Sequence, residues 1–229
     1  MKANPTLAKQ KAEEAVAGGV LTSSDKDVLI NQGLTNEMYR MYYSWQDCGT
    51  NANLITIMEG MQDPRLPLYM TMNQGDIKCE DGSTIAAGTR YLGIRPGHDI
   101  VSKPNEYVNY SYIVLDYTTP LPVMFAAESY FLRAEGALRG WNMGGAAKDF
   151  YEEGIRTSIK HQLAYKGSFA GISSISDADI EAYINNTATQ EDLVDPVNSK
   201  FNYKAMNNVG TKWNESGSNE EKLQQIIIQ

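Results

Sequence analysis

Apolar residues recur at helical spacing in several separate stretches of this chain. In the first stretch, apolar side chains from Leu7 to Val16 lie three or four positions apart. Asn4 can cap its start, and the pair Gly18-Gly19 can end it in a left-handed conformation. The same reasoning predicts further helices over residues 52–59, 125–139 and 177–185, one that opens at Gly144-Gly145, and one that runs from Ser218 to the end of the chain.

Two of these helices begin with a sequence that can form a capping box. Ser176 is followed three residues later by Asp179, and Ser218 is followed at the same spacing by Glu221. In this arrangement each side chain accepts a hydrogen bond from the other residue's backbone N–H. We therefore expect well-defined N-termini for both helices.

A short glycine-rich turn separates the helix over residues 125–139 from the one that opens at Gly144-Gly145. Two helices joined in this way fold into an antiparallel hairpin. Small residues on the facing sides, such as Ala134, Ala147 and Gly154, allow a close approach that is typical of a tetratricopeptide-type helix pair. The pattern does not repeat at a fixed period of about 34 residues, so a full repeat array is not supported.

Residues 63–122, which lie between the predicted helices over residues 52–59 and 125–139, are rich in Gly, Pro, Asn and Tyr and have only short apolar runs. We expect brief strands over residues 68–72 and 89–94, with turns at Asp81-Gly82 and Arg95-Pro96-Gly97, and another short strand over residues 211–213. The sequence thus predicts a mainly α fold with long loops and a few short β-strands. Long loops held on a rigid scaffold often carry binding residues.

Composition and charge narrow the class of function. The 229 residues carry 20 Lys and Arg against 28 Asp and Glu, a net charge of −8, which argues against binding to nucleic acid or to an anionic membrane surface. Two cysteines and two histidines are too few for a disulfide framework or a zinc site of the usual kinds, so we expect no metal and no cofactor. The chain has 14 Tyr and 3 Trp but only 5 Phe, a balance that favours aromatic side chains with a polar group at the surface.

Residues 122–141 resemble the signature helix of the SusD/RagB family, and residues 144–159 resemble its partner helix. The first match includes Phe131-Leu132 and Ala134-Glu135, and it departs from the family pattern at Gly136, where alanine is usual. Two outer landmarks are also similar, namely Asp63-Pro64-Arg65-Leu66 and, later in the chain, Thr211-Lys212-Trp213 followed by residues 220–229. The landmarks keep the family order over nearly the whole chain.

This resemblance implies a helical, tetratricopeptide-containing lipoprotein on the outer face of the Bacteroidetes outer membrane. Members of the family bind oligosaccharides and pass them to a TonB-dependent transporter of the SusC type. Family chains are about twice as long, so the resemblance implies a C-terminal portion that lacks the lipid-bearing cysteine, and the uncapped Ile226-Ile227-Ile228 end favours truncation. We divide this partial domain into helices and an aromatic loop (1–62), a loop-rich binding segment (63–122), a helix hairpin (123–165), and loops with a truncated C-terminal helix (166–229).

Sugar rings stack their C–H faces on aromatic side chains, and their hydroxyl groups need amide, carboxylate or guanidinium partners. Three clusters have that composition, each of which could equally serve to pack loops onto helices. The candidate ligand-binding residues are Tyr42, Tyr43, Trp45, Asp47, Tyr91, Arg95, Asn109, Tyr110 and Tyr112. Trp141 and Trp213 are better explained by packing in the core.

We expect this chain not to be an enzyme. A glycoside hydrolase would need two suitably placed carboxylates, and Glu128 and Glu135 lie about 10 Å apart along a helix, beyond the usual separation of about 5–9.5 Å. Salt-bridged structural acids explain this pair better. His98 beside Asp99 has no accompanying nucleophile motif. Two other functions remain open beside glycan binding: a scaffold that docks the transporter without holding sugar, and, less favoured, a glycoside hydrolase.

Overall fold

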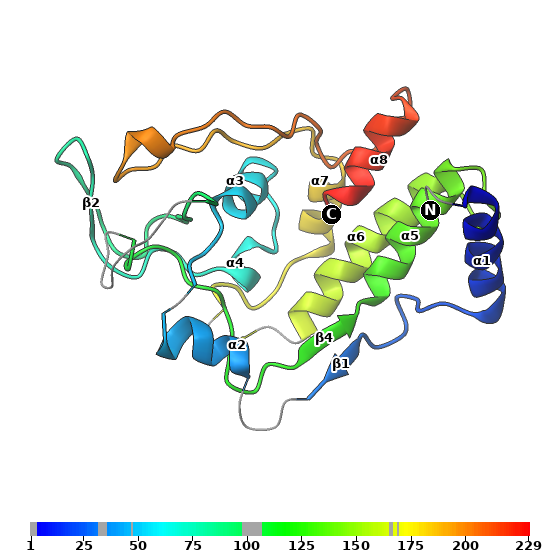
Figure 1. Cartoon of the computed structure of the whole chain (residues 1–229), viewed down its shortest axis with the longest axis horizontal. Helices are drawn as coiled ribbons and strands as arrows, with labels where there is room; N and C mark the ends of the chain where they lie inside the picture. Colours follow the sequence, from blue (N-terminus) through cyan, green and yellow to red (C-terminus); the bar gives the residue numbers. More distant parts are fainter. Residues whose placement is uncertain (1–3, 32–35, 47, 98–106, 165–166, 169) are drawn as a thin grey trace. The chain divides into compact units, whose positions relative to one another are not determined.

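The computed structural model describes residues 4–31, 36–46, 48–97, 107–164, 167–168 and 170–229 (Figure 1). These residues fall into two compact units, each built from segments that are distant in sequence. Unit 1 comprises Met1–Ile30, Leu121–His161 and Lys212–Gln229, and unit 2 comprises Asn31–Pro120 and Gln162–Thr211. Helices dominate over strands, which confirms the mainly α prediction. The four-part division of the chain stays a prediction.

Unit 1 is built from long helices and one small sheet. Its elements are α1 (Pro5–Gly18), β1 (Val28–Ile30), β4 (Leu121–Met124), α5 (Ala126–Leu138), α6 (Ala147–Ala164, up to His161 in this unit) and α8 (Asn219–Ile227). Strands β1 and β4 pair in an antiparallel manner, and Val28 lies opposite Met124. Asn4 caps α1, and both predicted capping boxes are present, at Ser176–Asp179 in unit 2 and at Ser218–Glu221 in unit 1.

The α5–α6 hairpin forms as predicted, and the two helices run side by side (Figure 1). Gly154 makes the close approach possible, because a Cβ atom there would lie 2.8 Å from the ring of Phe131. Tyr151 is fully buried, with the ring of Trp213 at 5.2 Å between centroids. The packing role predicted for Trp213 is thus confirmed, whereas Trp141 is only half-buried.

The N-terminus of α5 is capped by a residue from a distant part of the chain. Its own N-cap, Phe125, has no side chain that can accept a hydrogen bond. Asp27, just before β1, accepts a hydrogen bond of 2.7 Å from the backbone nitrogen of Ala126, and the same carboxylate oxygen lies 3.0 Å from Nδ1 of His161 on α6. One carboxylate therefore ties α5, α6 and the small sheet of unit 1 together.

Unit 2 consists of short helices connected by long loops. Its elements are α2 (Glu37–Tyr39), the π-helix η1 (Arg40–Ser44), α3 (Ala52–Gly60), α4 (Leu66–Tyr69), β2 (Ile77–Lys78), β3 (Thr84–Ile85), α7 (Asp177–Ile184) and the 3-10 helix η2 (Ser199–Phe201). Strands β2 and β3 form a minimal antiparallel hairpin. One core cluster gathers Ile55, Met58, Leu66 and Met70, and a second gathers Ile77, Leu92, Tyr107 and Tyr110.

The strands predicted in and after the middle segment are wrong. Residues 66–69 form the helical turn α4, which Pro67 favours because proline suits the first turn of a helix. Met70 and Ile94 each make only an isolated β-bridge, to Ile113 and Asn51 respectively. Residues 211–212 form a bend, and residue 213 is in no regular element, so no strand forms there. Short apolar runs in loops do not distinguish a strand from a buried turn.

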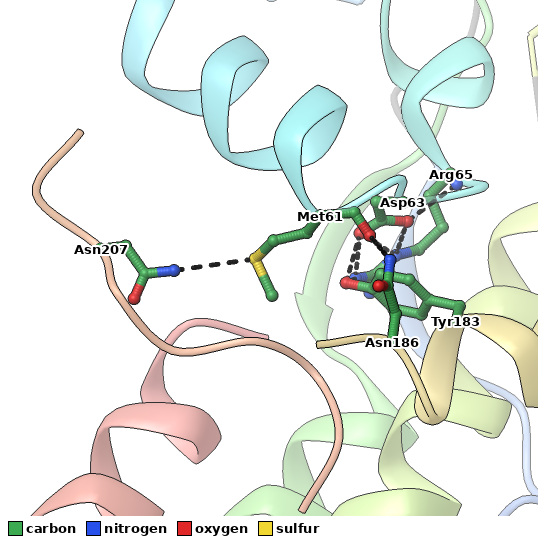
Figure 2. Close-up of polar contacts among 6 residues, drawn as sticks. All are labelled: Met61, Asp63, Arg65, Tyr183, Asn186 and Asn207. Atoms are coloured by element: carbon green, nitrogen blue, oxygen red, sulfur yellow. Dashed lines mark hydrogen bonds and ion pairs between the residues drawn. The ribbon is translucent and has the colours of Figure 1, made fainter. Parts of the chain in front are cut away.

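The Asp63-Pro64-Arg65 landmark forms a buried ion pair in unit 2 (Figure 2). Nε of Arg65 donates to both carboxylate oxygens of Asp63, at 2.9 and 3.1 Å, and Nη2 donates to Oδ2 at 2.5 Å. The hydroxyl of Tyr183 on α7 also donates to Asp63, at 2.9 Å. Only 6% of the Arg65 side chain and 4% of the Asp63 side chain are exposed.

This ion pair affects the protonation of Arg65 and of the neighbouring Tyr183. Burial lowers the pKa of the Arg65 guanidinium, but the charge of Asp63 and the neighbouring Tyr183 outweigh that effect and hold this pKa well above its usual value. Burial, together with the charge of Asp63, raises the pKa of Tyr183, so its hydroxyl stays neutral and can donate. The pair thus joins the turn before α4 to helix α7.

Candidate functional site

The aromatic run from Tyr39 to Trp45, which contains three candidate ligand-binding residues, lies on α2, on η1 and directly after η1 in unit 2. Asn36 caps α2 with a side-chain oxygen that accepts hydrogen bonds from Met38 and Tyr39. The chain then continues as a π-helix, and the backbone nitrogen of Trp45 donates to the carbonyl of Arg40 at 3.0 Å. Such π-helical turns are frequent at functional sites.

Five tyrosine rings meet at this segment and form what we name the tyrosine cluster. Tyr39 stacks on Tyr43 with 4.6 Å between ring centroids, and it contacts Tyr117 at 4.2 Å. Tyr112 packs edge-on against Tyr42 at 5.5 Å and against Tyr43 at 5.6 Å. The cluster therefore joins residues of the π-helix to residues from a loop far along the chain.

Asn36 holds the two sides of the cluster together. Its backbone nitrogen donates to the carbonyl of Tyr117 at 2.7 Å, and its amide nitrogen donates to the carbonyl of Thr119 at 2.6 Å. Asn36 is only 3% exposed, so water does not compete for these hydrogen bonds. The position of Tyr117 beside Tyr39 is thus fixed by backbone contacts as well as by the rings.

The inner members of the cluster are anchored through their hydroxyl groups. Tyr42 and Thr50 form a hydroxyl–hydroxyl hydrogen bond of 2.6 Å, and Thr50 donates in turn to the carbonyl of Ser111. Tyr43 donates to the carbonyl of Ile113. Burial raises the pKa of Tyr42 to about 12 and also raises that of Tyr43, so both hydroxyls stay protonated.

Two aromatic side chains at this segment are exposed to solvent. Trp45, directly after η1, is 53% exposed, and Tyr117, at the edge of the cluster, is 43% exposed. Tyr42 is 7% exposed and belongs to the core, so it forms the buried side of the cluster. Trp45 and Tyr117 thus keep part of their aromatic surface open to solvent, which stacking on a sugar ring requires.

The remaining predicted residues do not join this cluster. Tyr91 is half-buried and packs on the Ile55 core cluster. Arg95 lies over the ring of Tyr203, 5.8 Å from its centroid, and Asn109 donates to the carbonyl of Asp76 at 3.0 Å. Each of these side chains braces a loop of unit 2.

The prediction that Tyr110 contacts ligand needs a correction. The candidate Asp47 lies outside the described residues. Tyr110 is 2% exposed, packs edge-on against Tyr107 at 5.0 Å and donates its hydroxyl to Asp195 at 3.1 Å. A ring buried in this way presents no face to a ligand, because it packs in the second core cluster with Ile77, Leu92 and Tyr107. We therefore leave Tyr110 out of the candidate site.

Sequence reasoning did not select Tyr117. It stands alone in the turn of residues 116–119, and Asp116 and Thr119 form that turn by a hydrogen bond of 2.8 Å between the Asp116 nitrogen and the Thr119 hydroxyl. Only the tertiary contact with Asn36 brings it beside the π-helix. Tyr39 had a clearer signal, because it lies only three and four residues before the candidates Tyr42 and Tyr43 in the same aromatic run.

The two carboxylates considered as catalytic candidates both lie on α5. Glu135 pairs with Arg139 at 2.6 Å, as expected for a structural acid, and Glu128 is exposed on α5. His98 lies outside the described residues. No group of three His, Cys, Asp or Glu side chains within the described ranges is placed to hold a metal ion. In the same ranges, no helix combines the length and apolar character needed to cross a membrane.

A titratable carboxyl lies at the border of the Ile55 core cluster. Burial, together with the charge of Glu191, raises the pKa of Glu59 on α3 to about 7, and Arg90 opposes this shift. The folded protein therefore keeps this carboxyl protonated up to about neutral pH, whereas the unfolded chain releases the proton near 4.5. Its contribution to stability is lost as the pH rises between these two values.

We expect Glu59→Gln to be more stable than the wild type at pH 8 and equally stable at pH 4. The amide cannot ionise, and solvent screening limits the gain at pH 8 to about 1 kcal/mol. Urea denaturation of the intact protein at the two pH values measures the difference. Glu191→Gln is the matched control and gives a smaller gain, since it removes the repulsion but leaves Glu59 buried. Equal stability of Glu59→Gln and wild type at pH 8 would contradict this assignment.

Comparison with solved structures identifies the class of fold. A chitin-binding SusD homologue from Flavobacterium johnsoniae is 34% identical, with a TM-score of 0.79 over 99% of this chain and 43% of that one. SusD homologues from Bacteroides thetaiotaomicron and Bacteroides ovatus are each 32% identical, with TM-scores of 0.77 and 0.75, over 96% of this chain and 42% of theirs. The chain thus spans about two fifths of the length of the solved structures that it matches.

The family model described as Susd and RagB outer membrane lipoprotein matches residues 1–229. The chain therefore belongs to the SusD-like family, which confirms the resemblance seen in the helix hairpin and in the Asp63-Pro64-Arg65 landmark. Comparison with curated proteins gives no significant match.

Proposed function

We propose that this chain forms part of a cell-surface glycan-binding protein that takes part in nutrient uptake at the outer membrane. Membership of the SusD-like family supports the general role. The chitin-binding activity named for the Flavobacterium johnsoniae homologue supports a neutral polysaccharide as the class of ligand. The protein binds its glycan without chemical change and passes it to a SusC-type TonB-dependent transporter, and it is held at the outer membrane as a lipoprotein.

The observation that carries the proposal is the tyrosine cluster together with the exposed Trp45. Trp45 and Tyr117 provide the stacking faces, while Tyr39, Tyr43 and Tyr112 hold the base in place. Aromatic side chains that are rigid before binding lose little conformational entropy when a ligand stacks on them. Asp47, Tyr91 and Arg95 stay candidate ligand contacts on the strength of the sequence alone.

We expect Trp45→Ala to weaken glycan binding by about tenfold or more, a loss of ~1.4 kcal/mol or more, because an exposed stacking face is removed. Isothermal titration calorimetry of the intact protein with the glycan that the wild type binds measures this effect. Trp45 is largely exposed, so the melting temperature should stay unchanged. Met206→Ala is the control, since Met206 is an exposed apolar residue of unit 2 outside the cluster. Unchanged affinity in Trp45→Ala would remove this segment from the proposed site.

A further inference from the structure

A pocket lies in unit 1, at the end of α5 and the start of α8. It is a pocket of about 450 Å³, within the usual range of about 300–1,000 Å³ for small-ligand sites. Its lining includes Glu135, Arg139, Trp141, Asn219, Glu220 and Leu223. All of these residues belong to unit 1, so the pocket shares no residue with the tyrosine cluster of unit 2.

Several polar groups of this pocket are available to a ligand. Nε and Nη2 of Arg139 both contact the same carboxylate oxygen of Glu135, at 2.8 and 2.6 Å. The other oxygen of Glu135 and Nη1 of Arg139 make no hydrogen bond to any residue that the structure describes. Within the described part of the chain, the side chains of Asn219 and Glu220 make no hydrogen bond or ion pair. An amide, a guanidinium and two carboxylates thus line one small hollow.

Trp141 supplies the aromatic wall and is held firmly. Its backbone nitrogen donates to the carbonyl of Gly136 at 3.0 Å. A Cβ atom at Gly136 would lie 2.6 Å from the sulfur of Met143 and 3.4 Å from Cε3 of Trp141, so both side chains pack directly on the helix at this glycine. The half-buried ring is therefore positioned before any ligand arrives.

We propose that this pocket is a second carbohydrate subsite, which takes a terminal neutral or amino sugar. A Trp face stacks on sugar C–H groups, and the carboxylates, the guanidinium and the amide can accept from and donate to the hydroxyls. Two carboxylates against one guanidinium make the pocket net negative, which disfavours uronic acids and other anions. The choice of a carbohydrate as ligand rests on the proposed function. The pocket itself shares no residue with the tyrosine cluster.

The test uses the intact protein labelled with 5-fluorotryptophan, whose ¹⁹F resonances are assigned with Trp→Phe variants. Chitotetraose and maltotetraose are the neutral probes, and tetragalacturonate is the acidic one. We expect the Trp141 resonance to shift saturably with at least one neutral probe, also in a Trp45→Ala background, and to stay unchanged with tetragalacturonate. Glu220→Gln should weaken that response about fivefold, whereas Glu128→Gln, an exposed acid on the same unit, should leave it unchanged.

The resonances of Trp45 and Trp141 separate this inference from the proposed function. A shift at Trp45 without any shift at Trp141 at saturating sugar would overturn the second subsite alone. A shift at Trp141 without one at Trp45 would support the subsite and count against the site at the tyrosine cluster. An equal response to the neutral and acidic probes would overturn the charge argument on which the ligand class depends.

Discussion

Arg65→Met is expected to lower the free energy of unfolding by about 3–5 kcal/mol, because it leaves the buried carboxylate of Asp63 without its counter-charge. Asp63 is 4% exposed at its side chain and accepts hydrogen bonds from Arg65 and Tyr183, so water cannot replace the guanidinium. Denaturant unfolding of the intact protein measures the loss. Arg95→Met is the matched control and should cost under about 1 kcal/mol, since Arg95 makes one long hydrogen bond of 3.4 Å and one ring contact.

The double variant Asp63→Asn/Arg65→Met sharpens this prediction. An amide at position 63 can still accept the 2.8 Å hydrogen bond from the backbone nitrogen of residue 65. Because the amide is neutral, the double variant leaves no unpaired charge buried at this position. Part of the stability lost in Arg65→Met should therefore return. An Arg65→Met protein as stable as the wild type would show that the ion pair of the landmark does not hold this unit together.

Gly60→Ala should also be strongly destabilising, by about 1–3 kcal/mol or more. Gly60 is the last residue of α3, and a Cβ atom there would lie 2.3 Å from the carbonyl oxygen of Thr189 and 2.5 Å from the backbone nitrogen of Glu191. The neighbouring segment could not yield easily, because Glu191 donates from its backbone to Thr56 at 3.1 Å and Gln190 donates to the Thr56 hydroxyl at 3.0 Å.

Gly18→Ala is the matched control for this substitution. Gly18 is likewise the last residue of its helix, α1, but no atom lies within 4 Å of the position of an added Cβ. Alanine there should be neutral or slightly stabilising, since it restricts the unfolded chain more than glycine does. Thermal unfolding of both variants makes the comparison, and equal effects at the two positions would contradict the close approach at Gly60.

Six helices, namely α1, α3, α5, α6, α7 and α8, were predictable because their signals are local. Asn51 begins α3, Ser176 and Ser218 begin α7 and α8, and the pattern around Gly154 specifies the α5–α6 hairpin. Such signals need only residues a few positions apart. The landmark at Asp63 and Arg65 was visible in the sequence, but its partner Tyr183 was not, because only the fold brings α7 to it.

The candidate site was predictable only in part. The run from Tyr39 to Trp45 has the composition of a sugar-stacking segment, and the structure brings its three tyrosines into the tyrosine cluster. Tyr110 has the same composition around it and is buried, because exposure depends on packing against Ile77 and Leu92 and not on local sequence. Asp27 and Tyr117 act through contacts with distant backbone groups, which no local pattern reveals.

The central claim, that the protein binds a glycan, is tested most directly by calorimetric titration of the intact wild-type protein with a panel of neutral and acidic polysaccharides. We expect saturable binding of at least one neutral glycan, with acidic glycans bound more weakly. Absence of binding to every glycan in the panel would contradict it and would favour a scaffold that docks the transporter without holding sugar.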